Sequence, residues 1–246
     1  MVSDYRIRRY ASSVEFPEHV HSHIKPCYLG LVDEGNEGFF SPIAEHFPAT
    51  YRQLCSGERV ELMEVEMERT TGMGDQVIDR MYFWSVALSP SRDLILNIPR
   101  YDMLSAARQG VRDRYYGKLP ASMSGFFHFM DGGKIAEFPV FEGVDFPRGY
   151  QDWATIYAYY ASEKRLHQGD DIALADHLSM DEVRVVMTLR NRDFLVCPLG
   201  SATPVLYLVR VDRPTSAELL ESPEALLDRY LQRCLADVED DTITLC

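Results

Sequence analysis

The sequence predicts an α+β fold with an antiparallel sheet, packed helices, a three-strand meander and a C-terminal helix. Apolar and polar residues alternate over 183–189, and two further apolar runs, 194–197 and 205–209, follow after turn-rich segments. Such runs are typical of antiparallel strands joined in a meander, the first of them half-buried. Residues 222–238 begin with Ser-Pro-Glu and continue with apolar residues at helical spacing, which predicts a serine-capped final helix. Strands and helices arranged in this way favour the α+β class over a doubly wound sheet.

Length and composition set the organisation that we expect. A chain of 246 residues with 46% hydrophobic and 26% charged residues buries a sizeable core as one large or two small domains. We divide it into a β-rich region of unknown type, residues 1–110, and an α+β region, residues 111–246, and the two can form one domain. No apolar run reaches the roughly 18 residues of a membrane-spanning helix, and no apolar signal core follows the N-terminal arginines. We therefore expect a cytoplasmic protein.

The first hundred residues are expected to be β-rich with one helix. Residues 27–32 form a short apolar run before a turn, which predicts a strand. Residues 43–54 have a helical pattern that Pro48 is expected to break or kink. Residues 77–88 indicate a long, largely buried strand that follows a turn at 71–75.

Residues 63–68 alternate strictly between apolar and acidic side chains. As a strand they place Glu64, Glu66 and Glu68 on one side, where like charges repel one another and require water or a cationic partner. We favour a solvated strand edge, and a cationic partner is the alternative.

Helices are expected in the middle of the chain. Residues 102–116 predict one helix, and residues 119–133 predict a short aromatic helix that Gly132 and Gly133 end. An aromatic stripe at helical spacing over 150–160 indicates core packing.

Residues 138–149 contain two prolines, two glycines and three phenylalanines, which predicts an irregular loop. Loops that carry aromatic side chains beside carboxylates are plausible contact surfaces, and the alternative is a loop folded back onto the core. The candidate partner-binding residues lie in this loop and in an acidic segment further on: Phe141, Glu142, Asp145, Phe146, Asp170 and Asp171.

Net charge is the strongest global feature of the chain. Thirty-eight acidic residues against 25 basic ones give a formal net charge of −13, which disfavours nucleic acid and anionic membranes as partners. The charge is explained either by solubility or by complementarity to a basic protein, whose association it steers.

Three closely spaced histidines form the one metal-like constellation in the sequence. On an extended strand His19, His21 and His23 lie on one side, where imidazoles can meet a zinc ion. Ligands at this spacing rarely converge on one ion without additional ligands from elsewhere in the chain, so we favour a structural or exposed role and expect no metal and no cofactor.

The five cysteines form no C-x-x-C pair, and local motifs for hydrolase, nucleotide-binding or metalloprotease chemistry are absent. The chain is therefore expected not to be an enzyme.

Short motifs in the second half resemble the SUKH superfamily, the Smi/Knr-like domains. They are Tyr116-Gly117-Lys118-Leu119-Pro120, then Phe126-Phe127 and Asp131-Gly132-Gly133. The meander followed by Ser222-Pro223-Glu224 is similar to the closing pattern of that family, and the resemblance spans roughly residues 111–238. It implies a bacterial immunity protein of the cytosol that binds and neutralises a cognate toxin, frequently a nuclease, without catalytic residues of its own.

Charge, missing motifs and resemblance together predict a stoichiometric inhibitor that binds a basic toxin through an acidic surface. The alternative is a metal-dependent hydrolase that uses the histidines of residues 19–23. A regulatory scaffold for an endogenous partner is a third possibility that the sequence does not distinguish from immunity.

Overall fold

The computed structural model describes residues 2–24, 26–90, 92–98, 119–123, 132–135, 138–143, 174–175, 177–179, 182–198, 200–201, 203–236 and 243–245 of the chain. The strands are β1 (Val2–Tyr10), β2 (Glu61–Thr70), β3 (Gln76–Ser89), β4 (Arg92–Asn97), β5 (Gly132–Ile135), β6 (Phe138–Gly143), β7 (Val183–Leu189), β8 (Phe194–Pro198), β9 (Tyr207–Arg210) and β10 (Arg213–Leu219). The α-helices are α1 (Glu18–His23), α2 (Pro26–Leu29), α3 (Gly35–Phe40), α4 (Pro48–Cys55) and α8 (Pro223–Ala236), and the 3-10 helices are η1 (Ser13–Glu15), η2 (Leu31–Glu34) and η3 (Ser41–Ile43).

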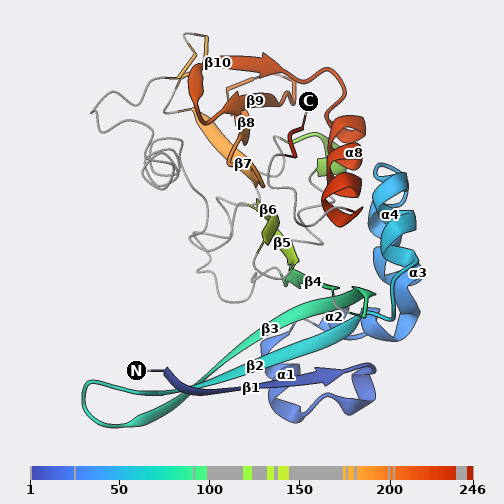
Figure 1. The fold of residues 1–246 in the computed structure, drawn as a ribbon, viewed down its shortest axis with the longest axis vertical. Helices are drawn as coiled ribbons and strands as arrows, with labels where there is room; N and C mark the ends of the chain where they lie inside the picture. The colour runs from blue at the N-terminus through green and yellow to red at the C-terminus, as the bar shows by residue number, and fades with distance from the viewer. Residues whose placement is uncertain are drawn as a thin grey trace.

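The described strands form one antiparallel sheet in which each strand pairs with the next along the chain, from β1 to β10. Figure 1 shows the long β1–β2–β3 ribbon at one end of the molecule and β7 to β10 at the other. The predicted α+β class is confirmed, and so is the meander, as β7, β8 and β9. Strand β10 was not predicted, because its polar residues and Pro214 lack the apolar alternation that marks a strand.

The N-terminal region contains more helix than expected, since α1, α2, α3 and α4 lie between β1 and β2. The strand predicted for residues 27–32 is wrong, because helices α2 and η2 occupy this segment. Pro26 opens α2, at a position where the missing N–H of proline costs little. Pro48 breaks the predicted helix of residues 43–54 as expected, and α4 begins at that proline.

Helices α4 and α8 lie side by side (Figure 1), and α8 caps α4. The buried Asp228 of α8 accepts hydrogen bonds from the backbone N–H groups of Ala49 at 2.9 Å and Thr50 at 2.8 Å. The residue at the N-cap of α4, Phe47, makes no side-chain capping bond. A carboxylate 178 residues further along the chain therefore satisfies amides that the helix itself leaves without acceptors.

One core cluster joins buried residues from both ends of the chain. It includes Phe39 and Trp84 from the N-terminal region and Tyr230 and Leu235 from α8. The rings of Phe39 and Trp84 meet edge to face, with centroids 5.2 Å apart. The hydroxyl of Tyr230 donates to the carbonyl of Val140 at 2.7 Å and accepts from the N–H of Arg190 at 2.7 Å, so this buried phenol connects α8 to β6 and to the turn after β7.

The middle of the sheet corrects two predictions. Residues 138–143 form β6 and not a loop, because they pair with β5 on one side and β7 on the other. Gly132 and Gly133 lie in β5, so they begin a strand, although Gly132 adopts the positive φ of 141° that favours glycine.

Strand β7 is buried on both sides and not half-buried as predicted. Val186 and Met187 belong to the main core cluster, whereas Val183 and Val185 belong to a second, smaller cluster. A register irregularity in the pairing with β8 falls between Val185 and Met187.

Several predictions fall outside the described residues: the helix of 102–116, most of the aromatic helix of 119–133 and the aromatic stripe of 150–160. Among the helices in the described ranges, none combines the length and the apolar character needed to cross a membrane.

A buried ion-pair network as the candidate functional site

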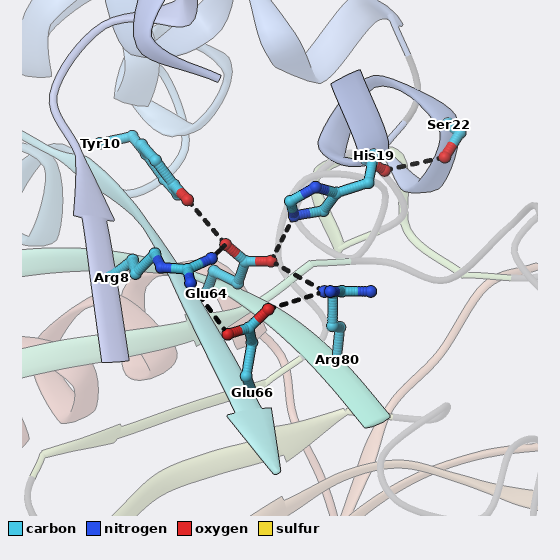
Figure 2. A network of polar contacts seen from close by, with 7 residues as sticks. All are labelled: Arg8, Tyr10, His19, Ser22, Glu64, Glu66 and Arg80. Atoms are coloured by element: carbon cyan, nitrogen blue, oxygen red, sulfur yellow. Dashed lines mark hydrogen bonds and ion pairs between the residues drawn. The ribbon is translucent and has the colours of Figure 1, made fainter. Parts of the chain in front are cut away.

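A dense group of charged side chains lies between β1, β2, β3 and α1 (Figure 2). Strand β2 turns Glu64 and Glu66 toward α1, and both are buried, with 0% and 8% of their surface exposed. The favoured expectation of a solvated edge is wrong, because β2 pairs with β1 on one side and with β3 on the other. The alternative, a cationic partner, is what the fold provides.

Each carboxylate oxygen of Glu64 has a hydrogen-bonding partner (Figure 2). The hydroxyl of Tyr10 donates to one oxygen at 2.7 Å, and Nε2 of His19 lies 2.6 Å from the other. Two guanidinium groups lie further away, Arg8 Nη1 at 3.7 Å and Arg80 Nε at 3.4 Å. A buried carboxylate is tolerated only when its oxygens are hydrogen-bonded and its charge is compensated, and both conditions are met here.

The same two arginines hold Glu66. Arg8 Nη2 lies 3.1 Å from one oxygen of Glu66, and Arg80 Nε lies 3.0 Å from the other. In the sheet register Arg8 of β1 is opposite Glu64, and Arg80 of β3 is opposite Glu66. Arg8 and Arg80 therefore bring two positive charges to the two negative charges of Glu64 and Glu66.

Electrostatics of the network follow from burial and from these contacts. Burial by itself raises the pKa of Glu64, but hydrogen bonds from Tyr10 and His19 and the charges of His19 and Arg8 outweigh it, so the pKa is lowered. Burial, with the nearby Glu64 charge, raises the pKa of Tyr82 to about 12. The pKa of Tyr10 is raised by burial and by its hydrogen bond to Glu64. Glu64 is therefore ionised and both phenols are protonated at neutral pH.

Helix α1 places His19 at this network because of its own apolar residues. Val20 and Ile24 are buried at 0% and 4% exposure, and both belong to the main core cluster with Phe16. Phe16 just before the helix also packs its ring against Tyr10, with centroids 5.8 Å apart. Ser22 Oγ donates to the carbonyl of His19 at 2.8 Å. Because Val20 and Ile24 pack into the core, the side chain of His19 points toward Glu64 (Figure 2).

The extended geometry considered for the three histidines is wrong, because residues 18–23 are helical. Residues two apart on a helix point in different directions, so His21 does not share a side with His19. The ring of His21 lies 6.3 Å from that of Phe16, and His19 faces Glu64. Within the described ranges, no group of three or more histidine, cysteine or acidic side chains is placed to hold a metal ion.

The predicted partner-binding residues have different outcomes. Phe141 and Glu142 lie in β6, where they are opposite Leu189 and Thr188 of β7, so they are strand residues and not loop residues. The other candidates fall outside the described residues: Asp145, Phe146, Asp170 and Asp171.

The two carboxylates are recognisable in the sequence, whereas their partners in the network were not predicted. Residues 6, 8 and 10 read Arg-Arg-Tyr, and residues 78, 80 and 82 read Ile-Arg-Tyr. This period-two placement of cations beside tyrosines matches the alternation of the acids in β2. When β1 and β3 are paired with β2, this placement predicts which side chains contact Glu64 and Glu66.

A buried carboxylate that holds an imidazole is also the arrangement that orients a histidine base in hydrolases. Here the carboxylate additionally accepts from Tyr10 and faces two arginines, so its charge is compensated within the chain. We conclude that the network fixes α1 to the β1–β2–β3 part of the sheet.

Comparison of this chain with protein-family models, with curated proteins and with solved structures finds no match.

Proposed function

We propose that this chain is a binding protein of the cytosol that neutralises a cognate toxin, such as a nuclease, through an acidic surface. The proposal rests on the net charge of −13, on the resemblance to the SUKH superfamily, and on where the carboxylates lie in the fold.

The observation that carries the proposal is the acidic character of the helical layer between β1 and β2. Residues 11–60 contain seven acidic residues and three basic ones, and all seven acids are exposed. They are Glu15, Glu18, Asp33, Glu34, Glu37, Glu45 and Glu58. The buried acids of β2, in contrast, are compensated by Arg8 and Arg80. Negative charge is thus neutralised inside the fold and retained at this surface, where it attracts a basic partner.

Such a surface inhibits a nuclease by occupying the basic cleft that binds nucleic acid. Carboxylates take the place of phosphates there, and their field accelerates association. The candidates Asp145, Phe146, Asp170 and Asp171 belong to the same proposal as further contacts, with the phenylalanine as a desolvated anchor.

Capture of the partner from native lysate at low salt, followed by a growth test, checks the proposal. The captured protein is expected to be basic and toxic when expressed alone, and co-expression of this chain is expected to restore growth. Recovery of no basic protein at low salt counts against the proposal, and so does a captured protein whose toxicity persists.

Charge reversal then locates the surface. The triple variant Glu34→Lys, Glu37→Lys, Glu45→Lys is compared with Asp170→Lys, Asp171→Lys. Reversal in the true interface is expected to slow association more than it accelerates dissociation, with a weaker salt dependence. An unchanged association rate removes that set from the interface.

A further inference from the structure

The opposite side of the β1–β2–β3 ribbon has a composition that the ion-pair network does not explain. Residues on this side include Tyr5 and Ile7 of β1, Val65 and Met67 of β2, and Met81 of β3, which we call the open face. Tyr5 and Ile7 are 69% and 52% exposed, and the other three are only partly buried.

Strand β2 therefore has its acidic side covered by the fold and its apolar side turned away from the helices. Its charged residues Glu64 and Glu66 are turned to the covered side and buried, while its apolar residues Val65 and Met67 are turned to the open face. A register shift by one residue exchanges the two sides. The fold instead buries two carboxylates, with arginines to compensate them, and keeps the apolar side outward. An apolar side that leaves Tyr5 and Ile7 exposed beside three partly buried residues is typical of an interaction site.

The charges that border the open face neutralise one another. At one end Arg69 pairs with Asp79. At the other end Arg9 pairs with Asp93 and with Glu61, the latter at 3.5 Å. In a chain of net charge −13 this side is nearly neutral, so charge does not favour a basic partner here. A second copy can approach it without the repulsion that the rest of the surface imposes.

The side chains of β2 on this side are self-complementary. In order they are Glu61, Met63, Val65, Met67 and Arg69, which is acid, methionine, valine, methionine and base. When two such strands lie antiparallel with their centres at Val65, each Glu61 is opposite the Arg69 of the other copy. Met67 of each copy then lies over Met63 of the other, which is already buried at 7% exposure, so Val65 and Met67 supply the apolar contact of β2.

The neighbouring strands follow the same symmetry. Val65 lies between Ile7 of β1 and Met81 of β3 in the sheet register, so this apolar row meets its own copy. Tyr5 of one copy then faces Arg9 of the other, which is a favourable cation–π pair.

We propose that the open face is a homodimer interface in which two sheets pack face to face about a two-fold axis at the Ile7–Val65–Met81 row. This is an isologous contact, in which one patch is complementary to itself, and aligned sheet packing is its natural geometry. The inference is independent of the proposed function, because it concerns the other side of the sheet and a different partner.

Sedimentation velocity of the full chain over about 1 to 200 µM tests the dimer, since an interface of limited area is expected to dissociate in the micromolar range. Wild type is expected to shift from monomer to dimer across this range. Val65→Lys places two cations together at the axis and is expected to raise the dissociation constant at least about a hundredfold. The matched control is Ile78→Lys, at a residue of β3 that points to the opposite side and is 48% exposed, and it is expected to leave the dimer intact.

Charge exchange tests the symmetry itself. Glu61→Arg and Arg69→Glu each place like charges opposite one another, and each is expected to weaken the dimer about tenfold. The double variant restores opposite charges between the copies but not the pairs of Glu61 with Arg9 and of Arg69 with Asp79 within each copy, so it is expected to bind more tightly than either single variant and less tightly than wild type. Circular dichroism and thermal melting identify variants that lose the fold.

The proposal is overturned if wild type stays monomeric over the whole concentration range or if folded Val65→Lys dimerises as well as wild type. A folded double variant that binds no more tightly than either single variant also overturns the two-fold arrangement.

Discussion

Replacement of Glu64 by glutamine tests the ion-pair network most directly. The substitution keeps the size of the side chain but removes its charge, and it turns an amide N–H₂ toward groups that donate. The carboxylate accepts from Tyr10 at 2.7 Å and lies 2.6 Å from Nε2 of His19. Tyr10 and His19 contact different carboxylate oxygens, so the single amide oxygen keeps one of these contacts and the amide N–H₂ takes the place of the other oxygen.

The expected loss of stability follows from the contacts. Hydrogen bonds to a charged group contribute about 1.5 to 3 kcal/mol each, and removal of one partner from a buried ion pair costs about 3 to 5 kcal/mol. Because His19 and Arg80 are each 31% exposed at their side chains, solvent relieves part of that cost. We expect Glu64→Gln to lower the free energy of unfolding by about 3 kcal/mol, which corresponds to a decrease in melting temperature of about 6 to 12 °C.

The effect depends on pH in a defined direction. The pKa of Glu64 in the folded protein is lowered from its ordinary value of 4.5. The stabilisation from its charge is therefore fully present above about pH 4.5 and is lost as the pH falls through the lower folded-state pKa. The difference in unfolding free energy between wild type and Glu64→Gln is expected to be largest near neutral pH and to shrink in acid.

Urea denaturation monitored by circular dichroism, repeated from neutral pH into acid, measures this difference. The matched control is Glu68→Gln, which lies on the same side of β2 but is exposed, and it is expected to be close to wild type. Equal stability of the two variants refutes the reasoning, and so does a difference from wild type that grows as the pH falls.

Three further predictions concern other contacts of the fold. Asp228→Ala removes the acceptor for two amides at the start of α4 and is expected to lower the free energy of unfolding by about 2 kcal/mol in urea denaturation; wild-type stability argues against the cap. Tyr230→Phe leaves a buried carbonyl of β6 and a buried N–H after β7 without their partner, so a loss of about 2 to 3 kcal/mol is expected by the same measurement. Ultraviolet titration is expected to show that Tyr82 ionises with a pKa of about 12. In Glu64→Gln that pKa is expected to fall, because a nearby negative charge is gone, and an unchanged or higher value contradicts the assignment.

Local patterns were sufficient for the most regular elements. The long strand of residues 77–88 is β3 (Gln76–Ser89), and the turn before it is closed by hydrogen bonds between Thr71 and Asp75 and between Gly74 and Thr71. The final helix begins at Pro223 after its serine. In each case the signal lies within a few residues, as alternation, a turn or a cap, so no distant contact was needed to identify the element.

Segments whose structure depends on packing were predicted incorrectly. Residues 27–32 form a short apolar run that suits a strand or a helix equally, and an extended geometry was considered for the histidines of residues 19–23. They become helices where Val20, Ile24 and Val32 enter the core. Residues 138–143 contain proline and glycine, which indicates a loop, yet pairing with β5 and β7 holds them in the sheet. Tertiary contacts outweigh weak local preferences in such segments.

The sequence by itself determined that β2 has one acidic and one apolar side, because the period of a strand depends only on its backbone. It did not determine which side the helices cover. That depends on Arg8 and Arg80 lying opposite the two acids and on His19 being carried to Glu64 by a helix whose apolar residues enter the core. Burial of a charge is decided by the partners that folding brings to it, and these partners come from segments far apart in the chain.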